Sequence, residues 1–106
     1  MLPGELLRSN ANPVNTEGEQ RAGLKAVFAV SVFQIEGTQA KLDITIEHKN
    51  EDDMQWTLAA TFASITTPGL YSKELAAPKQ VCRLSLVLAG EKAWARVSEL
   101  ETLWAL

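Results

Sequence analysis

The stretch LDITIEHKNEDDMQWTLAATF, residues 42–62, decides the fold class of this chain. Apolar and polar residues alternate over 42–46, and this period of two places the apolar set on one face of a β-strand. The polar run 50–53 interrupts the alternation, which resumes over 54–62. The two runs therefore predict an antiparallel hairpin with one buried face and a polar turn at 50–53.

Trp56 shares alternate positions with Met54, Leu58 and Phe62 in the second run. If the turn at 50–53 closes the hairpin, these side chains lie on the same face as the apolar residues of the first run. The pattern therefore predicts that Trp56 is the central core residue and not a ligand contact.

Further strands are expected on both sides of this hairpin. The segment 24–35, LKAVFAVSVFQI, is apolar on both faces, which is typical of a central strand covered on both sides or covered on its outer side by a partner. Pro68 and Gly69 suit a type II turn, and the mixed segment 70–75 suits an edge strand. Strands are also expected over 80–89 and 93–100, whereas the end of the chain fits either a strand or a short helix.

These elements predict an all-β protein, an antiparallel, jelly-roll-like β-sandwich of about seven to eight strands. Residues 1–23 are expected to form an N-terminal arm or irregular lead-in, and residues 24–106 a single domain. The stretch VFQIEGTQAKLDITI resembles SLVLAGEKAWARVSE when Gly37 is aligned with Gly90. Such a repeat arises from a duplicated hairpin or from two hairpins with similar turn chemistry.

Composition argues against several functional classes. The net charge is −3 and the ten Lys and Arg residues are scattered, whereas binding to nucleic acid needs clustered positive charge. No apolar run approaches the length of a membrane span and no secretory signal is recognised, so we expect a cytoplasmic location, or a virion if the chain is phage-encoded. The single cysteine, Cys82, excludes an internal disulfide and is expected to face the core.

No motif in the chain predicts catalysis. His48 is the only histidine, so neither a histidine cluster for a metal nor a second base exists. The acidic residues at 51–53 lack the ligand spacing of a calcium loop, and no serine lies in a nucleophile elbow. We therefore expect no enzyme activity, no metal site and no cofactor.

The succession LDITIEHKNEDDMQWTLAATFASITTPGLY, followed by KQVCRLSLVLAGEKAWARVS, resembles the small β-sandwich proteins encoded among tailed-phage and prophage structural genes. In those chains a polar DG-like turn precedes a W-x-x-L-x-x-F strand, a T-x-x-G turn and a later strand that ends in Gly. The resemblance covers roughly residues 24 to 100, and the matching residues are Trp56, Ala59 or Leu58, Phe62, Thr67, Gly69 and Gly90. The chain departs from the pattern in its W-x-L spacing and in its acidic turn. Discoidin-like jelly rolls that bind carbohydrate are similar too, so the resemblance implies two functional classes.

The expected function is that of a non-enzymatic structural or assembly protein, a component of a virion or virus-like particle that associates with itself and with other virion proteins. The alternative is a small carbohydrate- or peptide-binding module that uses exposed aromatic rings. The candidate interface or ligand surface comprises the aromatic residues outside the hairpin and the apolar strand 24–35, namely Trp94, Tyr71, Phe28, Val30 and Val32.

Overall fold

The computed structural model describes residues 5–8, 14–16, 19–20, 25–76, 78–100 and 103–105, and this part of the chain is all-β. Two long strands, β4 (Lys25–Lys49) and β7 (Val81–Glu99), form the centre of one antiparallel sheet. Six shorter strands are added to them: β1 (Glu5–Arg8), β2 (Val14–Asn15), β3 (Glu19–Gln20), β5 (Thr57–Thr61), β6 (Gly69–Ala76) and β8 (Leu103–Ala105). The prediction of an antiparallel all-β protein is confirmed.

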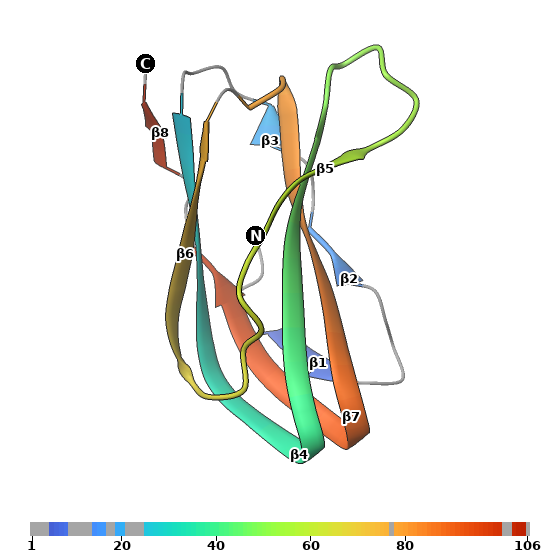
Figure 1. Cartoon of the computed structure of the whole chain (residues 1–106), viewed down its shortest axis with the longest axis vertical. Helices are drawn as coiled ribbons and strands as arrows, with labels where there is room; N and C mark the ends of the chain where they lie inside the picture. The colour runs from blue at the N-terminus through green and yellow to red at the C-terminus, as the bar shows by residue number, and fades with distance from the viewer. Residues whose placement is uncertain are drawn as a thin grey trace.

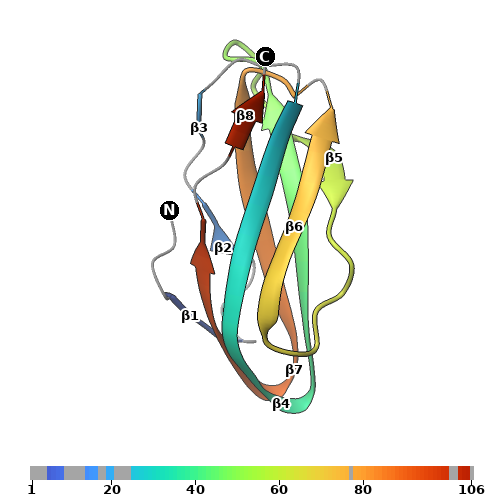
Figure 2. The same cartoon turned by 90° about the vertical axis from the view of Figure 1, so that its left-hand side faces the viewer.

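The sheet turns back on itself because β4 and β7 both bend near their middle (Figures 1 and 2). They pair with each other on both sides of the bend, from Val30 opposite Glu99 to Lys49 opposite Val81. We call the half that contains residues 41–49 and 81–89 arm 1. The half that contains residues 25–36 and 93–99 is arm 2.

The shorter strands complete the two arms. In arm 1, β5 lies beside β4, and β2 and β3 lie beside β7. In arm 2, β6 and β8 lie beside β4, and β1 lies beside β7. Part of the predicted N-terminal arm thus joins the sheet, and the other residues of 1–23 lie outside the described ranges. At the end of the chain, the described residues form a strand and not a helix.

The core lies between the arms. On either side of the bends, over 26–32 and 42–46 of β4 and 82–88 and 93–99 of β7, every second side chain is buried, as alternation requires for a sheet with one covered face. One hydrophobic cluster takes residues from both arms, so the inner faces of the arms pack on each other. Its largest fully buried members are Leu42, Ile44, Ile46, Ile65, Leu84, Leu86, Leu88, Val30, Val97 and Cys82.

The two bends have the same backbone conformation. Gly37 and Gln39 have φ angles of 126° and 53°, and Gly90 and Lys92 have φ angles of 122° and 50°. A Cβ atom on Gly37 would lie 2.5 Å from the Cα of Ala93, and one on Gly90 would lie 2.9 Å from the carbonyl oxygen of Thr38. Both positions therefore require glycine, because the backbones cross too closely for any side chain.

The equivalence extends along the strands. A shift of 53 residues, the separation of Gly37 and Gly90, converts the pair Leu42 and Leu88 into the pair Ala95 and Ile35, which is also observed. The similarity of sequence around the two glycines is thus accompanied by a similarity of backbone and pairing, with an approximate two-fold relation between the arms.

The predicted hairpin at 42–62 forms with a different register. The polar turn is present, and the amide of Asp53 donates to the carbonyl of Asn50 at 3.0 Å. However, β5 takes up one extra residue, Ala59, where the register shifts between Ile46 and Glu47, and Glu47 therefore lies opposite Leu58. Because one extra residue reverses the facing of the side chains beyond it, Leu58 and Trp56 lie on the outer face. The prediction that Trp56 is the central core residue is wrong.

Substitution of Gly37 by alanine tests the crossing of the two strands. We expect Gly37→Ala to lower the free energy of unfolding by at least about 2 kcal/mol, because the new methyl group meets backbone and the φ angle is unfavourable. Urea unfolding measures this change. Thr38→Ala, at the neighbouring exposed position, is the control and should change stability little. Equal stability of the two variants would contradict the close approach.

Candidate functional site

Three residues of the expected interface line the core. Phe28, Val30 and Val32 expose only 3%, 1% and 2% of their surface. They occupy alternate positions of β4 and point toward arm 1, whereas the residues between them point outward. The expectation that these three side chains supply contact surface is therefore corrected, since a partner can touch only the opposite face of the strand.

The two expected aromatic residues lie on different faces of arm 2. Tyr71 is half-buried opposite Val30 on the inner side, and its hydroxyl donates to the carbonyl oxygen of Thr67 at 2.6 Å. Trp94 is half-buried on the outer side, opposite Glu36. Val30, opposite Tyr71, points to the core, whereas Glu36, opposite Trp94, points away from it. The two rings therefore lie on opposite faces of the sheet. They do not form one stacking platform.

The outer face of arm 2 carries most of the exposed large apolar side chains, together with the charged residues Lys25, Glu36, Glu74 and Arg96. Among the residues that the structure describes, eight large hydrophobic side chains are exposed, and five of them belong to this face. Leu6, Leu70 and Leu103 do so by their strand register, Phe33 by the alternation of β4, and Leu100 by its hydrogen bond to outward-facing Ala29. Phe33 is 55% exposed, Leu70 68% and Leu103 66%. Single exposed apolar side chains are common on proteins, but a contiguous group marks a contact surface. We call this group, comprising Leu6, Phe33, Leu70, Leu100 and Leu103, the arm 2 patch.

The outward-facing residues of β4 connect the members of the patch. Val27, Ala29 and Ser31 are half-buried along its middle. Leu103 lies opposite Val27, and Leu70 lies opposite Ser31. The amide of Leu100 donates to the carbonyl of Ala29 at 2.9 Å, which places Leu100 beside the same strip. Leu70, Leu100 and Leu103 therefore flank one strip of β4 that ends at Phe33, whereas Leu6 lies beyond Arg96 at the edge of the patch.

The outer face of arm 1 is polar by comparison. Arg83 donates to Glu47 at 2.9 Å, and its guanidinium carbon lies 4.3 Å from the ring centre of Trp56. Lys49 lies 5.1 Å from the same ring centre. The two cationic side chains cover part of the indole, and the ring in turn stabilises their positive charges. These contacts explain how Trp56 can lie on the outer face.

His48 lies opposite Cys82 across the strands of arm 1, and both side chains contact the backbone of Lys79. The amide of Lys79 donates to Nδ1 of His48 at 3.3 Å, and the Cys82 thiol contacts the carbonyl oxygen of Lys79 at 3.8 Å. Only 1% of Cys82 is exposed. A reactive thiol needs access to a substrate, so this burial favours a structural role for Cys82.

Burial, and next the positive charge of Lys79, lowers the pKa of His48 from its ordinary value of 6.5. Both causes disfavour the imidazolium form. The residue therefore stays neutral in the folded protein at pH values where it would be protonated in the unfolded chain.

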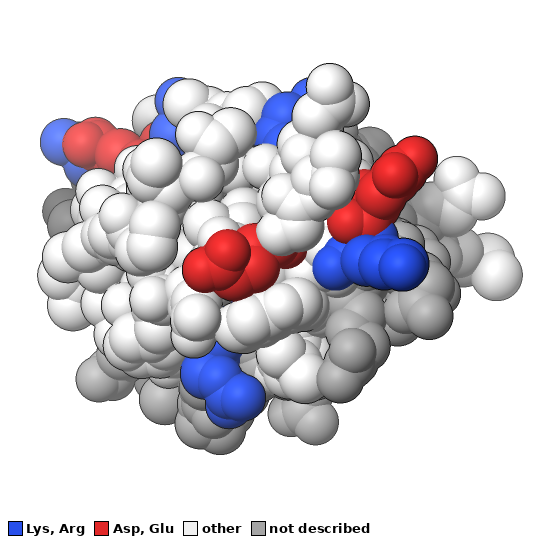
Figure 3. Space-filling model, turned by 90° about the horizontal axis from the view of Figure 1, so that it is seen from below, with Lys and Arg blue, Asp and Glu red and all other residues white. Residues whose placement is uncertain are grey.

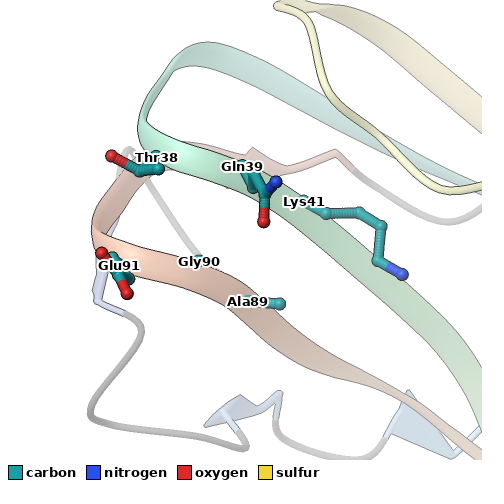
Figure 4. A pocket seen from close by; sticks show the side chains of 6 residues that line it. All are labelled: Thr38, Gln39, Lys41, Ala89, Gly90 and Glu91. Carbon is teal, nitrogen blue, oxygen red and sulfur yellow. The ribbon is translucent and has the colours of Figure 1, made fainter.

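The bend holds an open depression of about 610 Å³ lined by Thr38, Gln39, Lys41, Ala89, Gly90 and Glu91. Lys41 and Glu91 lie at opposite ends of it (Figure 4). Acidic and basic side chains are interspersed on the described part of this end of the molecule (Figure 3), so the depression has no single charge. It follows from the turn of the sheet and contains no converging set of buried polar groups.

Within the described ranges, no three side chains of His, Cys, Asp or Glu converge in a way that would hold a metal ion. The same ranges contain no helix that is long and apolar enough to span a membrane. The feature of the described surface that most clearly suggests a contact is therefore the arm 2 patch.

The lowered pKa of His48 predicts a pH dependence of stability. Below pH 6.5 the unfolded chain binds a proton at His48 that the folded protein does not bind, so the free energy of unfolding falls as the pH is lowered toward the folded pKa. Urea unfolding between pH 7 and pH 5 measures this loss, and NMR titration of the single imidazole gives the folded pKa. In His48→Gln this part of the pH dependence should disappear. A folded pKa at or above 6.5 would contradict the described environment.

Truncation of Trp56 should cost much less than truncation of a core residue. Trp56 is half-buried on an outer face, so we expect Trp56→Ala to lower the free energy of unfolding by about 1–2 kcal/mol. Leu86 is fully buried, and Leu86→Ala should cost about 3 kcal/mol or more. Denaturant unfolding compares the two variants. If Trp56→Ala lost more free energy of unfolding than Leu86→Ala, the indole would have to point inward, and the described register would be wrong.

Comparison with known proteins adds no relative. The sequence matches no family model and no curated protein, and no solved structure matches it either. The resemblance to tailed-phage structural proteins thus rests on the sequence pattern described above.

Proposed function

We propose that this protein is a non-enzymatic assembly protein that acts by self-association through the outer face of arm 2. The observation that carries the proposal is the arm 2 patch, which gathers five of the eight exposed large hydrophobic side chains in the described chain. Burial of apolar surface is the main favourable term in association, and isologous contacts between identical patches are the commonest way in which protomers pair.

The resemblance to phage structural proteins supports a virion or virus-like particle as the assembly. It also supports the finer description of the folded sheet as a β-sandwich of the jelly-roll kind, in which the two arms act as the two layers. Other virion proteins are then further partners. In such a role the protein needs neither a cofactor nor a catalytic group.

No observation on the described residues favours the alternative of a carbohydrate- or peptide-binding module. Such a module needs aromatic rings on one accessible surface. Tyr71 and Trp94 point to opposite faces of arm 2, and Trp56 lies on arm 1 beneath Lys49 and Arg83.

Two leucines on edge strands provide a matched test. Leu70 of the patch is 68% exposed, and Leu58 on the outer face of arm 1 is 65% exposed. We expect the unmodified protein to associate with rising concentration in analytical ultracentrifugation. Leu70→Lys should remain monomeric because a charge then lies in the contact, whereas Leu58→Lys should associate like the parent.

Thermal unfolding of both variants shows whether they are folded, and neither substitution touches the core. A parent protein that is monomeric at every concentration overturns the proposal. Equal loss of association in the two variants overturns the assignment of the contact to arm 2. A glycan array that gave specific binding would favour the binding module instead.

A further inference from the structure

The outward-facing residues of β4 in arm 2 follow a symmetrical order. From the start of the strand they are Lys25, Val27, Ala29, Ser31, Phe33 and Glu36, with Gln34 beside Phe33 at a bulge. Opposite charges lie at the two ends, larger apolar side chains come next, and the two smallest side chains are central. The order is the same from either end except that the sign of the terminal charge is reversed.

A strip with this order is complementary to itself when two copies pack antiparallel. If the two-fold axis passes between Ala29 and Ser31, Lys25 of one copy lies over Glu36 of the other. Val27 then lies over Phe33, and Ala29 lies over Ser31. Small side chains at the centre allow the two sheets to approach, and the opposite charges at the ends fix the register.

The alternative isologous arrangement is unfavourable. If the strands of the two copies run parallel, Lys25 lies over Lys25 and Glu36 lies over Glu36. Like charges placed against each other at an interface oppose association and suppress that arrangement. The charges at the ends of β4 therefore distinguish the two packing directions, which the apolar middle alone does not.

We infer that the arm 2 patch is covered by the arm 2 patch of a second copy, packed face to face with the β4 strands antiparallel and with Lys25 of each copy against Glu36 of the other. This inference rests on the proposed function, since it specifies the partner and the orientation of the same surface. Lys25 is already 3.3 Å from Glu74 within its own chain, and its side chain remains 58% exposed, so it is available to a second carboxylate.

Charge reversal tests the orientation. Each dimer contains the Lys25 and Glu36 contact twice, so Lys25→Glu and Glu36→Lys should each raise the dissociation constant of the dimer by about tenfold. The double variant Lys25→Glu with Glu36→Lys should return it close to the parent value, because the opposite charges meet again. Sedimentation equilibrium at low salt measures the four constants.

Lys41→Glu is the matched control. Lys41 is also half-exposed and ion-paired, at 3.6 Å from Asp43, but it lies in arm 1. It should leave the dissociation constant unchanged. Circular dichroism and thermal unfolding show that each variant is folded.

The outcomes separate the two proposals. If the protein associates, Leu70→Lys abolishes association and the double variant shows no recovery, the antiparallel orientation is overturned and the proposed function stands. If the parent protein is monomeric, both are overturned. The orientation is confirmed only if the single variants weaken the dimer and the double variant returns the dissociation constant to the parent value.

Discussion

The close contact between the backbones of β4 and β7 at their bends is the constraint on which the rest of the structure depends. Gly37 lies against Ala93, and Gly90 lies against Thr38 and Ala40. This contact lets two continuous strands turn back together, so that the inner faces of arm 1 and arm 2 pack on each other. A flat sheet would leave its apolar face exposed, whereas the bend lets the same pair of strands bury this face between the arms.

The arms are equivalent in pairing but unequal on their outer faces. In arm 1 the outward positions of β4 include Asp43, Thr45 and Glu47, and Glu47 is bound by Arg83. In arm 2 the outward positions of the same strand include Val27, Ala29 and Phe33, between Lys25 and Glu36. Inner faces are constrained by the common core, whereas outer faces are free to differ. This difference is the reason for proposing the outer face of arm 2, and not that of arm 1, as the contact surface.

Much of the fold could be predicted from alternation, because the inward positions of 42–46 and 82–88 are apolar without interruption. The extra residue of β5, Ala59, could not be predicted, because nothing in the sequence marks it. Without it, alternation places Trp56 on the inner face. Alternation also showed that 24–35 is apolar on both faces. It did not show which face meets the core, and so Phe28, Val30 and Val32 were expected at the contact that the outward residues form.

The edge strand of arm 2, β6, is protected against pairing with another strand, whereas the outer face of arm 2 is not protected against contact. β6 is an edge strand, paired with β4 on one side within the described chain (Figure 2). Lys73 lies opposite Phe28, so its position is on the inner side of the sheet, and yet it remains exposed. A second strand added to this edge would surround that charge with apolar side chains, and an inward lysine of this kind is a common protection against edge pairing. Leu70, three residues earlier on the same strand, points outward without such protection. The edge of arm 2 therefore disfavours addition of a strand, while its outer face remains accessible to a second sheet packed against it.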